Sequence, residues 1–233
     1  IEVATKDMRR DKSGQVMLRI AELADRTNSH WASLLSTLIS NGETLVCYDT
    51  QYFFDTDHEE GESGVQSNKI DVDISALPVE VHGTPTVPSV AEMQQAILQG
   101  VNQIVGFVDD QGEPMNEGAM EFLVIVPTGL SMVARDALSV QIGTALEQRA
   151  AGSDFKLTLA QNPRLKWTDK FVVIRTDGRT KPLIRQSETD VQLKAKAEGS
   201  EYEFDNDAHQ YGVDTWRNVG LGLWQHAVLV KLV

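Results

Sequence analysis

One stretch, residues 15–40, constrains the fold of this chain more than any other. Apolar side chains recur there every three to four positions, which is the pattern of an amphipathic helix, and Asn41-Gly42 follows as a stop signal. A helix of this length would extend about 39 Å at about 1.5 Å per residue, more than twice the average in globular proteins. The predicted apolar stripe consists of Met17, Ile20, Ala21, Ala24, Trp31, Leu34, Leu35, Leu38 and Ile39, with Asn28 interrupting it.

Two further helices are predicted downstream. Ser89 and Glu92 have the spacing of a capping box, in which each side chain accepts a hydrogen bond from the other residue's backbone, and the apolar pattern continues to about Val105. A third helix is expected to start after Pro127-Thr-Gly129 and to reach about Gly143.

Strands are predicted where apolar or alternating residues stand between turn signals. The segment 55–68 is acidic and contains glycine, so an exposed loop is expected there. Because the strands and helices do not alternate regularly, the fold class is α+β and not a doubly wound sheet. The predicted strands cover residues 1–5, 44–54, 121–126, 155–160, 170–176, 191–197 and 227–233.

Composition excludes several classes of protein. The formal net charge of -13 argues against a protein that grips nucleic acid, because such binding depends on clustered lysine and arginine. Cys47 is the only cysteine, which excludes an internal disulfide framework and a cysteine-rich zinc site. No membrane span or secretion signal is predicted. The chain opens with Ile1 and not with methionine, so we expect residues upstream of it.

The most chemical-looking segment is Phe54-Asp-Thr-Asp-His-Glu-Glu60. Its carboxylates and imidazole are possible metal ligands, and a metal-dependent α/β enzyme using Asp55, Asp57 and His58 is one alternative function. Adjacent residues in an extended segment point to opposite faces, however, and the spacing of a calcium loop or a zinc protease is absent. A nucleophile elbow and a phosphate-binding loop are absent as well. We therefore expect no enzyme, and no catalytic residue, metal or cofactor.

Two segments resemble a structural family instead. Tyr48-Asp-Thr-Gln-Tyr-Phe-Phe-Asp-Thr-Asp-His58 is similar to a segment that follows a long helix in the major head subunits of Mu-like tailed phages. Tyr211-Gly-Val-Asp-Thr-Trp-Arg-Asn-Val-Gly-Leu-Gly-Leu-Trp-Gln225 is similar to that family's closing pattern. The two motifs stand in the family's order, and the resemblance spans nearly the whole chain. The family's N-terminal arm and extended loop have no counterpart here beyond residues 1–5.

The resemblance implies the Hong Kong 97-type capsid fold, with residues 15–40 as its spine helix. Residues 1–85 would form the first part of a peripheral domain, residues 86–184 an axial domain, and residues 185–233 strands that return to the peripheral domain. It also implies a major capsid protein that assembles with copies of itself, as hexamers and pentamers, into an icosahedral shell around phage DNA. Scaffold, portal and decoration proteins would be further partners, DNA would be contacted non-specifically, and no membrane would be involved. The shell would assemble in the host bacterial cytoplasm and become part of the virion.

Large aromatic side chains and a few charged ones are the candidate assembly or corner residues, because aromatic side chains bury much area at interfaces. We expect Tyr52, Phe53 and Phe54 to fill the corner after the long helix, and Asp214 and Arg217 to form an ion pair within one subunit or between subunits. A shell of cellular origin with the same fold, enclosing an enzyme, is a second alternative. The full set of candidates is Tyr52, Phe53, Phe54, Asp55, Asp57, His58, Tyr211, Asp214, Trp216, Arg217 and Trp224.

Overall fold

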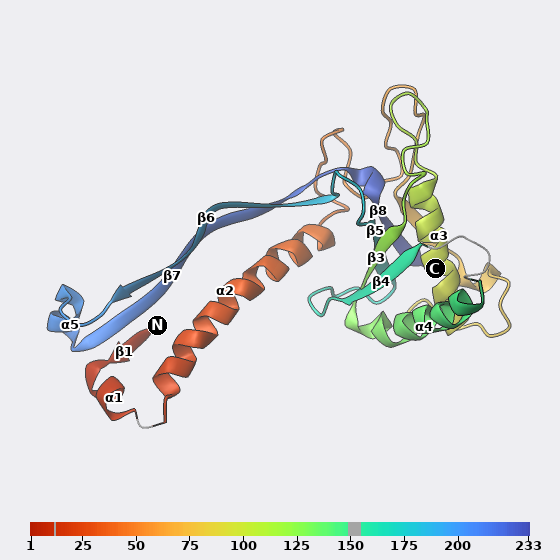
Figure 1. The fold of residues 1–233 in the computed structure, drawn as a ribbon. Helices are drawn as coiled ribbons and strands as arrows, with labels where there is room; N and C mark the ends of the chain where they lie inside the picture. Colours follow the sequence, from red (N-terminus) through yellow and green to blue (C-terminus); the bar gives the residue numbers. More distant parts are fainter. Residues whose placement is uncertain (12, 149–154) are drawn as a thin grey trace. The chain divides into compact units, whose positions relative to one another are not determined.

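The computed structural model describes residues 1–11, 13–148 and 155–233, and the side chains at 24, 28 and 140–148 lie outside the description. The chain forms two compact units, residues 1–35 with 185–220 and residues 36–184 with 221–233 (Figure 1). The helices are α1 Thr5–Arg10, α2 Gln15–Ser40, α3 Val90–Val105, α4 Ser131–Gln148 and α5 Glu201–Asn206, with short 3-10 turns at Ile74–Ala76, Thr128–Leu130 and Trp224–His226. The strands are β1 Glu2–Ala4, β2 Lys69–Val72, β3 Glu121–Val126, β4 Lys156–Gln161, β5 Lys170–Arg175, β6 Leu183–Lys196, β7 Ala208–Leu221 and β8 Ala227–Leu232.

The long helix α2 has the predicted bounds. Gly14 has a φ of 72°, which glycine adopts readily, and the Asp11 carboxylate then accepts hydrogen bonds from the backbone N–H groups of Gln15 and Val16 at 3.2 and 2.8 Å. At the other end the Gly42 N–H donates to the Ile39 carbonyl. The predicted stripe is only partly buried, since Met17 is 67% exposed and Ala21 is exposed, whereas Ile39 is buried. The side chains of Ala24 and Asn28, also named in the stripe, lie outside the described residues.

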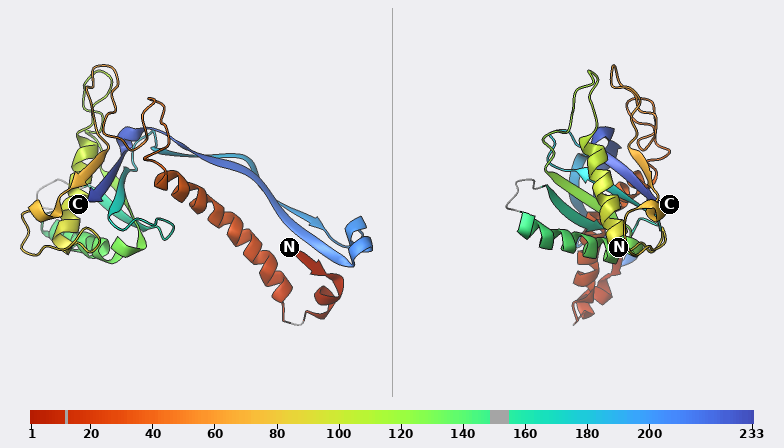
Figure 2. Two further views of the ribbon diagram at one scale, coloured as in Figure 1. Left: turned by 180° about the vertical axis from the view of Figure 1, so that it is seen from behind. Right: turned by 90° about the vertical axis from the view of Figure 1, so that its right-hand side faces the viewer.

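The first unit holds a three-stranded sheet in the order β1-β7-β6. Its two long strands run side by side and are joined by α5, as two further views show (Figure 2). Helix α5 is capped at its N-terminus by Ser200, whose hydroxyl accepts a hydrogen bond from the Glu203 N–H. Its C-cap is Asp207, which has the left-handed conformation. Strand β1 pairs with residues 208–210 of β7 alone, and β6 is an edge strand among the strands that the structure describes.

The second unit holds a mixed five-stranded sheet in the order β2-β8-β5-β3-β4. The central strands β5 and β8 are buried almost throughout, and α3 packs closely on them. A Cβ added to Gly100 of α3 would lie 2.8 Å from Val173 and 3.0 Å from Val230, so a larger residue would separate the helix from the sheet. The capping box predicted for α3 is present. This sheet joins strands from residues 1–85, 86–184 and 185–233, and which parts form the peripheral and axial domains stays a prediction.

Several predicted elements differ from the structure. Residues 44–54 form turns with a single bridge between Val46 and Tyr52, where a strand was expected, because Thr50 has a φ of 74° and breaks any extended run. The loop 55–68 is not wholly exposed, since His58 and Asn68 are fully buried. Helix α4 is longer than predicted, and β2, α5 and β7 were not predicted at all. No helix in the described part of the chain is long and apolar enough to cross a bilayer.

Candidate functional site

Two phenylalanines close the corner that follows α2. Phe53 and Phe54 are buried, and their rings meet edge to face at a centroid distance of 4.8 Å. The Phe54 N–H donates to the Gly42 carbonyl at 2.9 Å, and a Cβ at Gly42 would lie 2.6 Å from the Phe54 ring. Gly42 therefore ends the helix and also leaves room for the ring. The third predicted corner residue, Tyr52, is 46% exposed.

We expect Gly42→Ala to lower the free energy of unfolding by about 1–3 kcal/mol, because the buried Phe54 ring would have to leave its place. Urea unfolding of the chain measures this. Gly118→Ala is the matched control, since an added Cβ there meets nothing within 4 Å, and its expected change is within about 0.5 kcal/mol. Equal decreases in the free energy of unfolding for the two variants would contradict the argument that Gly42 leaves room for the Phe54 ring.

The histidine of the first motif lies in a buried polar cluster. His58 Nδ1 lies 2.5 Å from an Asp49 carboxylate oxygen, and Nε2 lies 3.2 Å from the Asn68 side-chain oxygen. Both ring nitrogens are therefore engaged by polar side chains of the protein.

Asn68 connects the loop and turn segments of this cluster. Its side-chain oxygen accepts from the Asp55 N–H at 2.9 Å, and its side-chain nitrogen donates to the Phe53 carbonyl at 2.6 Å and to the Trp224 carbonyl at 3.5 Å. These donor contacts to two carbonyls fix which end of the amide is nitrogen. One buried amide thus ties the first motif to residues near the other end of the sequence.

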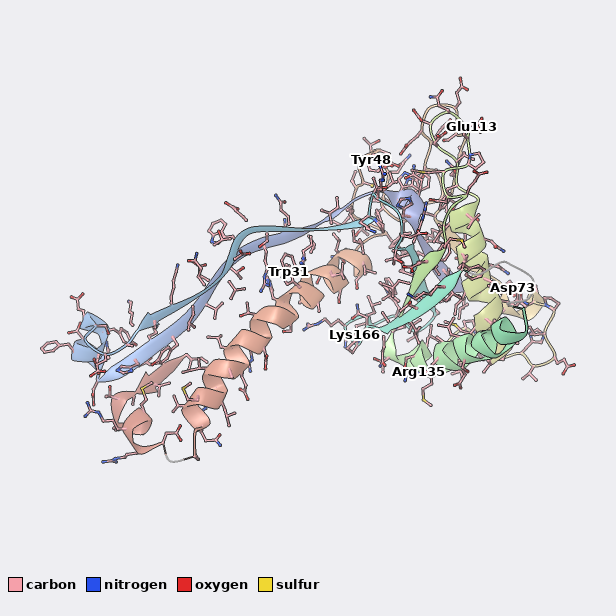
Figure 3. The ribbon with its side chains drawn as sticks, viewed as in Figure 1. Trp31, Tyr48, Asp73, Glu113, Arg135 and Lys166 are labelled. Atoms are coloured by element: carbon pink, nitrogen blue, oxygen red, sulfur yellow. The ribbon has the colours of Figure 1, made fainter. Side chains whose placement is uncertain are left out.

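The second motif supplies the apolar side of the same cluster. The Trp224 ring is fully buried, stacks on His58 with centroids 4.0 Å apart, meets Phe107 edge-on, and donates from Nε1 to Glu60 at 3.1 Å. Gln225 accepts a hydrogen bond from the Tyr48 hydroxyl at 3.0 Å. Tyr48 is labelled in Figure 3. We call this set of residues the motif cluster; it comprises Tyr48, Asp49, Phe53, His58, Glu60, Asn68, Trp224 and Gln225.

The motif cluster has the properties of a packed corner and not those of a reactive site. The Asp55 carboxylate accepts from the backbone N–H groups of Tyr52 and Thr56, and Asp57 lies 3.5 Å from the Gln51 amide. Within the described residues, no group of three histidine, cysteine or acidic side chains could hold a metal ion. Burial raises the pKa of the nearby Cys47 thiol to about 11, so this thiol stays protonated near neutral pH. The ligand set Asp55, Asp57 and His58 is therefore not assembled.

The remaining candidates lie on β7 in the first unit, and they contact different partners. The Arg217 guanidinium donates to His30 at 3.0 Å and to the Thr27 carbonyl, and it lies 4.9 Å from the ring of Trp31, which is labelled in Figure 3. Arg185 lies at the same distance from that ring. Asp214 pairs with Lys194, so the expected pair between Asp214 and Arg217 is wrong for the single chain. Successive residues of a strand point to opposite faces, which explains why these two, three positions apart, diverge.

Tyr211 and Trp216 have opposite environments on the same strand. The Tyr211 hydroxyl lies 4.0 Å from the Met8 sulfur of α1 and is partly buried, whereas Trp216 is 64% exposed. Asp49 and Glu60 stood within segments that the sequence singled out but were not among the candidate site residues, and Asn68 was missed entirely. Polar residues in an acidic segment look solvent-exposed, and no local pattern signals their burial. Only the tertiary contacts identify them.

Comparison with known proteins adds to this geometry. The family described as the Mu-like prophage major head subunit gpT matches residues 1–77 and 159–232, which is more than half of the chain. No curated protein has a sequence that matches the chain.

Solved structures supply a second comparison. A chain from the capsid of the cyanophage P-SCSP1u is similar with a TM-score of 0.57 and 8% identity, over 100% of this chain and 70% of that one. A chain from the mature capsid of bacteriophage PhiM1 has a TM-score of 0.53 and 11% identity, over 100% and 69%. A chain from the procapsid of bacteriophage JBD30 is 18% identical with a TM-score of 0.48, over 99% of this chain and 51% of that one. The chain thus spans about half the length of the JBD30 protein.

Proposed function

Because this chain belongs to the Mu-like prophage major head subunit family, we propose that it assembles with identical copies into the icosahedral shell that encloses phage DNA. The predicted family is confirmed by the match over residues 1–77 and 159–232. The chain has the Hong Kong 97-type capsid fold, as the sequence predicted.

The observation that carries the proposal is that the two family motifs are used for packing. His58 of the first motif and Trp224 of the second stack on each other inside the second unit, and Asn68 bonds to both, so these two motif residues are used in packing. When a protein's distinctive residues are buried in packing contacts, its function depends on the shape of the surface that this packing maintains. We therefore propose that it has no enzymatic activity.

Contacts between copies are proposed to use the surfaces that one chain leaves open. Among the described strands β6 is an edge strand, and β7 pairs on its other side with β1 over residues 208–210 alone, so much of the hairpin's backbone is open to a further strand. Tyr52 and Trp216 are the exposed aromatic members of the predicted assembly set and would contact neighbours directly. Phe53, Phe54 and Trp224 are buried, so their role would be to keep the subunit rigid. A closed lattice multiplies such individually weak contacts.

The proposal includes further partners. Copies would form hexamers and pentamers, with a scaffold, a portal and decoration proteins taking part, and with assembly in the host bacterial cytoplasm. The net charge of -13 fits a wall that touches the packaged DNA only non-specifically. The assignment of residues 86–184 to an axial domain, and of residues 1–85 and 185–233 to a peripheral domain, belongs to this proposal too.

Assembly of the full-length subunit with its own scaffold tests the proposal. We expect sedimentation as capsomers or shells, and closed shells in electron micrographs. A strictly monomeric species at high concentration would overturn it. Nuclease-protected DNA inside shells made with the packaging machinery would support the phage function, whereas a packaged enzyme would favour a cellular compartment.

A further inference from the structure

The short helix α5 presents one rigid, unpartnered face. Its inner side is fixed, because Glu203 bonds to His209 at 2.9 Å and to the Gly199 N–H at 2.7 Å, and Tyr202 lies 5.5 Å from the Lys196 ammonium. Glu201, Phe204 and Asp205 follow the i, i+3, i+4 spacing that places side chains on one helix face. All three are exposed, and Phe204 is 91% exposed, the largest value among the exposed large hydrophobic residues.

This face has the properties of a binding anchor. An aromatic ring on a capped helix loses little conformational freedom when it is covered, and aromatic residues dominate the energetics of interfaces. Neither Glu201 nor Asp205 has an ion-pair partner in the described part of the chain. The matching surface should therefore be cationic, and arginine would also stack on the ring.

A surface of that kind lies on α1, at the same end of the first unit (Figures 1 and 2). Thr5 is buried and Met8 contacts Tyr211, so these two form the inner side of α1. Lys6, Arg9 and Arg10 again follow the i, i+3, i+4 spacing, and all three are exposed. Within the described residues none of them forms an ion pair. Arg9 lies close enough to Glu203 of α5 to act on it electrostatically within the same chain. Lys6 and Arg10 on α1, and Glu201 and Asp205 on α5, carry opposite charges that form no ion pair among the described residues.

We propose that the outer face of α5 in one copy, formed by Glu201, Phe204 and Asp205, docks on the outer face of α1, formed by Lys6, Arg9 and Arg10, in a second copy. This inference rests on the proposed function, since it names one contact of the shell. The contact is heterologous, with different surfaces on the two sides, and such contacts close into rings or extend into lattices. Phe204 would lie between the two arginines, with the carboxylates pairing around it.

Charge reversal in trans tests the contact in the full-length subunit with its scaffold. One variant carries Glu201→Lys and Asp205→Lys, and the other carries Lys6→Glu, Arg9→Glu and Arg10→Glu. Each variant alone sets like charges against each other, so the concentration at which shells form should rise by about tenfold or more. In an equal mixture an α5 face of one variant can meet an opposite α1 face of the other, so shell formation should return most of the way to the original concentration. A ring with an odd number of subunits keeps at least one repulsive contact. Contacts within one chain stay repulsive in both variants, so recovery would specifically support contact between copies.

Phe204→Ala gives a second readout without changing charge, and the same rise of about tenfold is expected. Met132→Ala removes another well-exposed side chain and should assemble normally. The inference is overturned if the mixture assembles no better than the variants alone. It is also overturned if α5 variants with the melting temperature of the original protein form shells at the original concentration. Failure of the original subunit to form any shell would refute the proposed function instead.

Discussion

Trp224→Ala is expected to lower the free energy of unfolding by about 3–5 kcal/mol and to abolish shell formation by the full-length subunit. The indole is fully buried, stacks on His58 and donates to Glu60, so its removal leaves a cavity and an acceptor without its donor. Urea unfolding of the chain measures the first effect, and sedimentation of the full-length subunit measures the second.

Two further variants separate packing from hydrogen bonding at this position. Trp224→Phe keeps a ring against His58 but loses the indole N–H. It is therefore expected to lower the free energy of unfolding by less than Trp224→Ala does. Trp216→Ala removes a tryptophan that is 64% exposed and should change the free energy of unfolding by less than about 0.5 kcal/mol. A Trp224→Ala chain as stable as the Trp216→Ala chain would show that the motif cluster does not hold the second unit together.

Asn68→Ala is expected to lower the free energy of unfolding by about 3 kcal/mol or more, because several buried groups lose their hydrogen-bond partners at once. The Asp55 N–H, the Phe53 carbonyl and His58 Nε2 all bond to this one amide. Asn68→Asp should be at least as harmful although it preserves volume, since a carboxylate oxygen would face the Phe53 carbonyl. Urea unfolding again provides the measurement.

Asn218→Ala is the matched control for the buried asparagine, because Asn218 is exposed and its side-chain oxygen accepts a hydrogen bond from the N–H of the next residue. Its expected effect is within about 0.5 kcal/mol. If Asn68→Asp proved as stable as the original chain, the buried amide would have no special role in joining the two motifs.

The elements that could be predicted from the sequence carry their own local signals. Helix α2 combines an apolar stripe with Asn41-Gly42, α3 starts at a capping box, and β3 is an apolar run closed by Pro127. In each case the residues that start or stop the element are neighbours in the chain, so no tertiary contact is needed to recognise it.

The elements that were missed depend on distant partners. Strand β7 contains Gly212, Asp214, Asn218 and Gly220, which are poor strand residues, and it is extended because it pairs with β6 and β1. Residues 44–54 misled in the opposite direction, since their aromatic residues suggested a strand but lie in turns, where Phe53 and Phe54 are buried and Tyr48 and Tyr52 are exposed. The motif cluster was invisible for the same reason, because Asn68 gains its role only when Trp224 arrives beside it.

The order in which the strands of the second unit are synthesised has a consequence for the cell. Strand β8 lies in the middle of the second unit's sheet, between β2 and β5, and Trp224 and Gln225 precede it directly. Until those late residues have been synthesised, the sheet lacks an inner strand and His58 lacks its stacking partner. A product of interrupted translation therefore exposes an unfinished core to proteases. It also lacks the complete surface that other copies would bind. Because β8 is the last strand of this sheet to be made and lies inside it, truncated copies are removed before they can join a growing particle.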